Sequence, residues 1–422
     1  MIETPEVPTH WRITKLGFVA SVRARLGWKG LKAEEYLEDG YVFLSTPNIK
    51  YREIDFENVN YISQQRYFES PEIMLRTGDV LIAKDGSTLG ISNVVKHLPR
   101  PSTVNSSVAV IRPTPELDGR YLNYFFQSHR FQATIQEFKG GMGVPHLFQA
   151  DLRKFQVLLP PIPEQQAIAD FLDQRTGVLD STLSAHLALF HSLQSLRSES
   201  LDHFVSKGEP TRFRFCVRRL QQGWSPECEA RQAGPDEWGV LKVGCVNGHA
   251  FDPNEHKALP STLTPDPALE IRPRDLLMSR ANTRELAGSV ALVREVRPKL
   301  LLCDKLYRIH LDPGKMLPEY AELLLTSTHA RRQLQSMATG ASDSMQNISQ
   351  QIVLNLLLPI PSLAAQRIAC EQFWTFSNRI SGLTARIERQ MALLREYRQS
   401  LITAAVTGQI DVTSPKLDAV CP

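Results

Sequence analysis

The sequence predicts an α+β protein in which two strand-rich domains alternate with two long helices. Residues 158–163 and 356–361 carry nearly the same sequence motif, Leu-Leu-Pro-Pro-Ile-Pro and Leu-Leu-Leu-Pro-Ile-Pro, about 200 residues apart. A long segment without proline follows each motif. A repeat of this length is typical of a duplicated domain-plus-helix unit and not of a solenoid, whose periods are several-fold shorter.

Other parts of the two copies keep the same order. The matched residues are Gln166, Ile168 and Ala169 with Gln366, Ile368 and Ala369, then Ser200, Leu201 and Gly208 with Ser400, Leu401 and Gly408. Upstream, residues 78–84 match residues 274–280, although Arg274 stands where the first copy has Gly78. We therefore expect strand-rich domains at 1–163 and 208–361, spacer helices at 164–207 and 362–408, and a tail at 409–422.

The two segments without proline have helical apolar patterns. In the second segment the apolar residues recur at alternating steps of three and four, which indicates a coiled-coil seam: Phe373, Phe376, Ile380, Leu383, Ile387, Leu394, Tyr397 and Leu401. In the first segment they form a broader stripe: Ile168, Leu172, Leu179, Leu183, Leu187, Phe190, Leu201 and Phe204.

The charges of the two segments are opposite. Residues 164–206 hold six acidic and two basic side chains, and residues 362–408 hold three acidic and six basic ones. Opposed charges beside an apolar seam favour pairing of the two helices with each other. We expect an antiparallel coiled coil with pseudo-two-fold symmetry. The alternative is that each helix packs separately on its own domain.

Within the domains, short apolar runs between glycine and proline predict buried strands at 79–83, 107–111, 276–278 and 290–293, and closing strands that reach Leu159 and span 354–358. The apolar spacing predicts one helix over 121–138 and one over 320–337. Residues 139–143 read as a flexible glycine loop, and residues 339–344 read as a polar loop.

Bulk properties exclude several classes of protein. The net charge of +3 is below that of a purely electrostatic DNA binder. The six cysteines lack the CxxC spacing of zinc sites, which fits a reducing cytoplasm. We find no apolar run long enough to span a membrane and no secretory signal at the acidic start of the chain.

Motifs of catalysis are absent as well. The sequence has no dinucleotide fingerprint, nucleotide phosphate loop, HExxH zinc motif or GxSxG elbow. Residues 137–139 (Glu-Phe-Lys) resemble half of a nuclease motif but have no credible acidic partner upstream. We therefore expect a non-catalytic chain with no metal site and no cofactor of its own.

Loops at matched positions in the two copies carry side chains suited to DNA. Lysine and arginine suit phosphates and guanine, asparagine suits adenine, and serine and threonine suit either base. We expect the loop at 84–88 to present a cation and hydroxyls, and the loop at 280–284 to be its counterpart. The candidate DNA-binding residues are Lys84, Ser87, Thr88, Asn105, Lys139, Gly141, His146, Arg280, Asn282, Thr283, Arg284, Lys305, Ser344, Gln346 and Asn347. The alternative is that these loops are only turns.

The sequence resembles the specificity subunit of type I restriction–modification systems. The resemblance covers essentially the whole chain and is carried by residues 78–86, 158–166 and 401–411. It implies two target-recognition domains, each reading one half of a bipartite asymmetric DNA site, with the two helices fixing the unread gap between the halves. The second copy departs from the pattern at Arg274 and at residues 362–366.

The resemblance also implies partners for a cytoplasmic protein of phage defence. Two modification subunits would methylate adenine with S-adenosylmethionine, and restriction subunits, if present, would use ATP and Mg²⁺. Trp374 and Met391 are expected on outer helix faces as docking points, with burial as the alternative. A rival interpretation is a coiled-coil adaptor with two protein-binding domains and no DNA.

Overall fold

The computed structural model describes residues 7–25, 31–50, 53–139, 146–342 and 345–414. The chain forms two compact units. Unit 1 comprises Met1–Leu187 and Glu388–Pro422, and unit 2 comprises Ala188–Ile387. We call the strand-rich part of each unit its head. Among the described residues, no helix has the length and apolar character needed to cross a membrane.

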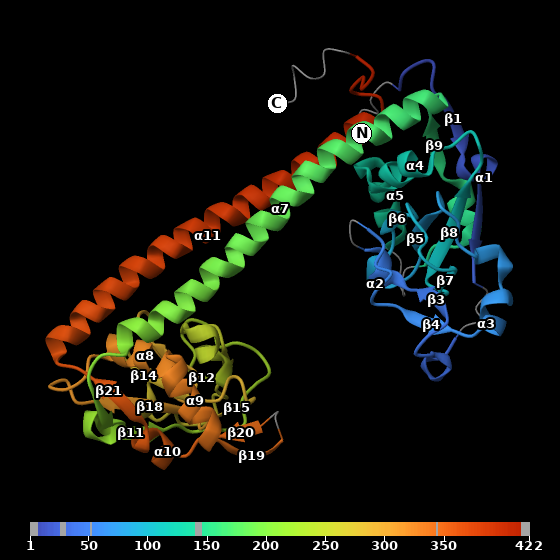
Figure 1. Ribbon diagram of the computed structural model, residues 1–422. Helices are drawn as coiled ribbons and strands as arrows, with labels where there is room; N and C mark the ends of the chain where they lie inside the picture. Colours follow the sequence, from blue (N-terminus) through green and yellow to red (C-terminus); the bar gives the residue numbers. More distant parts are fainter. Residues whose placement is uncertain (1–6, 26–30, 51–52, 140–145, 343–344, 415–422) are drawn as a thin grey trace. The chain divides into compact units, whose positions relative to one another are not determined.

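Head 1 contains a four-stranded sheet, a three-stranded sheet and a strand pair (Figure 1). The four-stranded sheet has the order β2 (Ala20–Ala24), β8 (Val108–Pro113), β5 (Val80–Ala83) and β6 (Ser92–Val94). The three-stranded sheet has the order β4 (Asn60–Ile62), β3 (Tyr41–Leu44) and β7 (Ser102–Val104), and the pair joins β1 (Arg12–Lys15) to β9 (Gln156–Leu159). Its helices are α1 (Leu16–Val19), α2 (Thr46–Ile49), α3 (Gln64–Phe68), α4 (Gly119–Gln127), α5 (His129–Lys139) and α6 (Gln149–Lys154).

Strand β5 is buried on both faces, as its unbroken apolar sequence predicts. Because successive side chains of a strand point to opposite faces, its residues divide between two cores. Val80 and Ile82 belong to the core that contains Tyr121 of α4. Leu81 and Ala83 belong to the core beneath the three-stranded sheet. The expected strands at 79–83 and 107–111 are thus confirmed.

Head 2 repeats this topology and adds a third sheet. Its four-stranded sheet has the order β11 (Val217–Gln222), β18 (Leu306–Leu311), β14 (Leu276–Ser279) and β16 (Val290–Leu292). The other sheets are β13 (His256–Ala258), β12 (Gly239–Leu241) and β17 (Leu300–Leu301); the pair β10 (Glu209–Arg212) and β21 (Leu357–Ile360); and β15 (Ala281–Asn282), β20 (Met345–Asn347) and β19 (Thr339–Ser342). Its α-helices are α8 (Pro318–Thr326), α9 (Thr328–Met337) and α10 (Gln350–Asn355).

A buried glutamine fastens each head to the start of its long helix. In unit 1, Gln165 Nε2 donates to the carbonyl oxygens of Glu116 and Pro160, and its Oε1 accepts from Asp118 N. In unit 2, Gln366 forms the same three bonds with Lys315, Pro361 and Leu317. Gln366 therefore corresponds to Gln165 and not to Gln166, so the repeat in the helices is displaced by one residue from the expected match.

The two long helices are α7 (Ile162–Val205) and α11 (Leu363–Val406), and each unit contains half of each. In unit 1, Arg398 Nε lies 2.9 Å from Asp180 Oδ1, and His186 Nε2 lies 3.2 Å from Gln390 Oε1. In unit 2, the ring of Phe204 lies 6.1 Å from that of Phe373. The start of α7 thus meets the end of α11 in one unit and the reverse holds in the other, which confirms antiparallel pairing in each.

The predicted seam of α11 is right at most of its positions, including Phe376, whose ring lies 6.2 Å from that of Phe204, and one residue out at the others. Phe373, Ile380, Ile387 and Leu401 are buried, whereas Leu383 and Tyr397 are 45% and 48% exposed. The intervening seam positions are Ser377 and Met391, which are buried, and Thr384 and Arg398, which are half-buried. The apolar pattern missed Ser377, Thr384 and Arg398 because their side chains are polar; Thr384 Oγ1 donates to Ile380 O, and Arg398 pairs with Asp180.

The expected docking role of Met391 on an outer face is therefore wrong, since Met391 is 6% exposed and lies in the seam. Trp374 also lies against other side chains. It packs on the core of unit 2, and the guanidinium carbon of Arg294 lies 5.2 Å from its ring centroid. Neither side chain is an open docking point.

Each of the two expected head helices is in fact a pair of helices. Serine separates them, Ser128 in head 1 and Ser327 in head 2. The Ser327 hydroxyl donates to Leu324 O and accepts from Ala330 N, and Ser128 bonds in the same way to Phe125 and Phe131. Such a serine caps a new helix and ends the preceding one, although the apolar spacing continues through it.

Two more expectations in head 2 are corrected. The expected polar loop at 339–344 contributes a strand, β19, to a hairpin with β20. The expected closing strand at 354–358 begins only at Leu357, because Leu354 and Asn355 end α10.

In head 1, the expected flexible loop begins with Lys139, which is the last residue of α5, and continues at 140–143 outside the described residues.

Candidate nucleic-acid interface

In head 1, three segments meet at the end of β5. Lys84 N donates to Ser107 O over 2.9 Å, and Leu147 N donates to Lys84 O over 2.9 Å. Asp85 and His146 form an isolated antiparallel bridge. The loop at 84–88, the turn at 105–107 and His146 are therefore neighbours, and all three segments hold positions that are matched in the second copy.

The side chains of this junction form a charged cluster. Asp85 contacts the imidazole Nδ1 of His146, and the ammonium of Lys84 lies 3.5 Å from the second Asp85 oxygen. Lys84 is buried, so the expectation that it presents an exposed cation is wrong: an unpaired cation at that depth would be costly, and Asp85 compensates it. The ring of Phe148 lies 4.4 Å from that of His146 and is 62% exposed.

The hydroxyl groups of the first loop lie on a single turn, Gly86–Thr88. Gly86 has φ of 68°, a conformation that glycine adopts without strain. Ser87 is exposed, and Thr88 is half-buried and donates to Asp85 O. Asn105 is half-buried, and its Oδ1 accepts from Ser107 N.

Head 2 forms the same backbone junction with different side chains. Arg280 N donates to Lys305 O over 2.9 Å, and Ile348 N donates to Arg280 O over 2.8 Å. These bonds correspond one for one to those of Lys84 in head 1. Here the bridge is extended into paired strands, with Ala281 opposite Asn347 and Asn282 opposite Gln346.

Amide groups predominate at the junction of head 2. Asn282 Nδ2 donates to Asn247 Oδ1 over 3.1 Å, and Gln346 and Asn347 lie on the adjacent strand. Arg280 is half-buried, and its Nη1 donates to Asp304 O. Thr283, Arg284 and Lys305 are exposed. Each amide offers a donor and an acceptor side by side, the pattern that reads an adenine edge, and arginine reads guanine.

Sequence reasoning missed Asp85, Phe148 and Asn247 as members of these junctions. For Asn247 the signal was the Asn-Gly pair, since Gly248 has φ of 75° and turns the chain toward Asn282. Three candidates add no side-chain information: Gly141 and Ser344 lie outside the described residues, and Lys139 is placed only as the last residue of α5. Within the described ranges, no group of three or more histidine, cysteine, aspartate and glutamate side chains is arranged to hold a metal ion.

Comparison with known proteins finds similarity to one family. Residues 8–185 match the model of the type I restriction modification DNA specificity domain. The specificity subunit of the type I restriction enzyme EcoKI from Escherichia coli (strain K12) is 23% identical over 426 residues, which cover 96% of this chain and 90% of the relative. Residues 8–185 thus carry a type I restriction modification DNA specificity domain, and nearly the whole chain is similar to a type I specificity subunit.

Two solved structures share the fold of nearly the whole chain. A chain from a structure of the type I R-M system aligns with a TM-score of 0.71 and 16% identity, over 96% of this chain and 100% of the other. The HsdS subunit of Thermoanaerobacter tengcongensis aligns with a TM-score of 0.51 and 16% identity, over 97% and 100%. At such identities the likeness concerns the fold alone.

Proposed function

We propose that this chain is the DNA-recognition subunit of a type I restriction–modification complex and that it reads a bipartite asymmetric site. The observation that carries the proposal is the duplicated junction. Both heads keep the same backbone hydrogen bonds at Lys84 and Arg280, while the side chains around them differ. Two readers for different sequences have this property, because the scaffold is constant and the base contacts vary.

Each head has its own recognition chemistry in this proposal. Head 1 offers Ser87, Thr88 and the Asp85–His146 pair, and head 2 offers the amides of Asn282, Gln346 and Asn347 with Arg280. Each good bidentate contact contributes roughly 1–3 kcal/mol of discrimination against the wrong base. The paired helices α7 and α11 would fix the number of unread base pairs between the two half-sites.

The chemistry of the complex belongs to partner subunits. Two modification subunits would supply S-adenosylmethionine-dependent methylation of adenine, and restriction subunits, where present, would supply ATP- and Mg²⁺-dependent cleavage. This chain would act in the cytoplasm without catalysing a reaction. Its contribution is to position the modification subunits on a defined sequence.

The experiment that tests this function is a methylation map of a host that carries this chain with its modification subunits. We expect one bipartite motif with a fixed gap, and none in a host that lacks the chain. Replacing the head 2 amides together (N282A/Q346A/N347A) should change only the half-site read by head 2. Methylation at unrelated sequences, or a motif that the triple variant leaves intact in both halves, contradicts the assignment of residues to half-sites.

A further inference from the structure

Both heads expose a phenylalanine at the same place in the fold. Phe18 is 77% exposed and Phe215 is 58% exposed. Each follows, by two residues, a fully buried anchor: Leu16, whose N–H donates to Phe155 O, and Phe213, whose N–H donates to Leu356 O. The strand before each anchor, β1 or β10, pairs in the same register with β9 or β21. Phe18 and Phe215 thus occupy equivalent, exposed positions in the two heads.

Cations lie within a few residues of each phenylalanine or on the segment that packs beside it. In head 1 they are Lys15, Arg153 and Lys154, and Gly17 packs so closely on Arg153 that a Cβ added to it would lie 3.0 Å from the Arg153 Cβ. In head 2 they are Arg212, Arg214, Arg218 and Arg219, with the Arg214 guanidinium 5.9 Å from the Phe215 ring centroid. We call these two sets, each with its phenylalanine, the flanking patches.

Few carboxylates compensate these cations. Arg212 and Arg214 both donate to the neutral amide oxygen of Asn355, over 3.1 and 2.7 Å, and Arg153 donates to Val22 O. Lys154 and Arg218 pair with Asp151 and Asp312. Among the described residues, Lys15 and Arg219 are exposed and form no ion pair. Each flanking patch is therefore positive, which fits a polyanion.

A short helix connects each patch to its reading junction. In head 1, α6 begins three residues after His146 and carries Arg153 and Lys154 at its end. In head 2, α10 begins three residues after Asn347 and ends at Asn355, the partner of the patch arginines. Six helical residues span roughly 9 Å. A DNA duplex that touches a reading junction is thus within reach of the neighbouring patch.

We propose that the flanking patches bind the phosphate backbone of duplex DNA beside each half-site, with Phe18 and Phe215 packing on the sugars. This inference rests on the proposed function and assigns it an affinity surface separate from the sequence-reading loops. Phosphate contacts of this kind set affinity and register without reading sequence. The aromatic ring adds apolar contact with the backbone between the cations.

The test measures DNA binding by the full chain as a function of salt. The quadruple variant K15Q/R153Q/R212Q/R214Q should reduce the magnitude of the log–log salt slope by roughly 0.9 for each phosphate that the variant no longer neutralises. Affinity should fall about tenfold or more, by the same factor on a random 30-base-pair duplex and on the methylated motif. F18A/F215A should weaken binding a few-fold and leave the salt slope unchanged.

The control neutralises four exposed cations outside the patches, K32Q/R197Q/K207Q/K257Q. Thermal unfolding of every variant verifies that the fold is retained. A slope for the patch variant equal to that of the control overturns the proposal. So does a loss of modification-subunit binding with an unchanged salt slope, since the patches would then serve a protein. Absence of any sequence preference in the unmodified chain would instead contradict the proposed function, because the patch test does not depend on sequence.

Discussion

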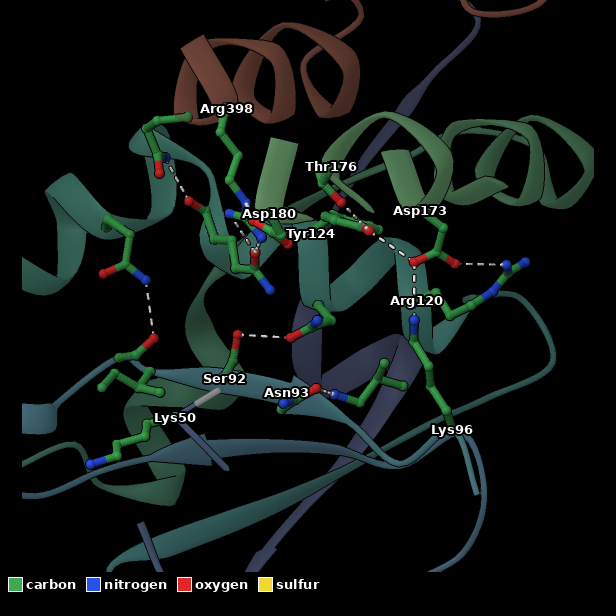
Figure 2. Close-up of a pocket in the computed structure, with 17 residues that line it drawn as sticks. Lys50, Ser92, Asn93, Lys96, Arg120, Tyr124, Asp173, Thr176, Asp180 and Arg398 are labelled. Atoms are coloured by element: carbon green, nitrogen blue, oxygen red, sulfur yellow. Dashed lines mark hydrogen bonds and ion pairs between the residues drawn. The ribbon is translucent and has the colours of Figure 1, made fainter. Parts of the chain in front are cut away.

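The joint between head and long helices is built differently in the two units. In unit 1 it is a network of ion pairs around Asp173 of α7, which contacts Lys96, Arg120 and the Tyr124 hydroxyl (Figure 2). In unit 2, Arg294 occupies the position that corresponds to Lys96. Its guanidinium lies over the ring of Trp374 and pairs with Glu322. Glu322 is buried, whereas Asp173 is part-exposed.

The difference affects the openness of the joint. In unit 1 the network lines a polar cleft of about 440 Å³ that also involves Arg398 and Asp180 (Figure 2). In unit 2 the aromatic rings of Phe204, Phe373 and Trp374 pack together at the joint. Ion pairs near solvent contribute little each and are screened by salt, whereas buried pairs are costly to break. The same position in the fold therefore accepts either a network of ion pairs or a cluster of packed aromatic rings.

The largest expected effect comes from breaking the joint of unit 2. Glu322 accepts from Leu292 N over 2.9 Å and pairs with Arg294 over 2.7 Å. E322A removes a buried carboxylate and leaves the Leu292 N–H and the Arg294 guanidinium without their partner. We therefore expect the free energy of unfolding to fall by about 3 kcal/mol. Urea unfolding followed by hydrogen exchange at α8 measures the loss. A change below about 1 kcal/mol would mean that the buried pair does not hold the joint.

The matched change in unit 1 is D173N, which we expect to lower the free energy of unfolding by about 1–2 kcal/mol. Burial by itself would raise the pKa of Asp173, but the Tyr124 hydrogen bond and the charge of Lys96 outweigh it and hold the pKa below its usual value. The ionised carboxylate therefore stabilises unit 1 fully above about pH 4, and this contribution is lost as the pH falls through the lowered pKa.

Hydrogen exchange at α4 measures this dependence. Exchange in the unmodified chain should accelerate below about pH 4 relative to D173N, and added salt should reduce the difference between the two. Equal sensitivity of α4 and α8 to salt would remove the distinction between the joints.

The smallest expected effect concerns the position before β5 and β14. Gly78 has φ of 90°, and its counterpart Arg274 has φ of 74°, a conformation that costs a non-glycine residue roughly 1 kcal/mol. R274G should therefore stabilise unit 2 by somewhat less than 1 kcal/mol, because the exposed ion pair with Glu319 is lost as well. G78A should lower the free energy of unfolding of unit 1 by about 1 kcal/mol. An added Cβ meets no atom within 4 Å at this position, so the change measures backbone strain alone. Opposite shifts in the urea midpoint, with the larger one in G78A, test the pair.

The sequence predicted those features that depend on regular periodicity. The buried strands and the antiparallel pairing of acidic α7 with basic α11 follow from apolar spacing and charge. The correspondence of the loop at Lys84 in head 1 with the loop at Arg280 in head 2 follows from their positions in the repeat. It missed features set by single hydrogen bonds. Ser128 and Ser327 divide helices whose apolar pattern is continuous, and Ser377 lies in the seam although it is polar.

The candidate site was predicted in position more than in detail. The fold brings the matched loops of each head together, and the burial of Lys84 beside Asp85 depends on a neighbour that the hydrophobic pattern does not single out. Asn247 joins Asn282 from a segment 35 residues upstream, and only the fold brings them together. The chemistry of such a junction depends on contacts between distant segments, which single-sequence patterns do not contain.

The glutamines that fasten each head to its helix have a consequence for chemical ageing. Gln165 and Gln366 each direct their amide nitrogen at two backbone carbonyl oxygens. Deamidation replaces that nitrogen with an oxygen, and a carboxylate would then face two carbonyl dipoles of the same sign. Replacing this one atom would turn two hydrogen bonds into electrostatic repulsion between the side chain and the two carbonyl oxygens. Burial of both amides shields them from hydrolysis, so the long-term integrity of each unit depends on keeping water from one side chain.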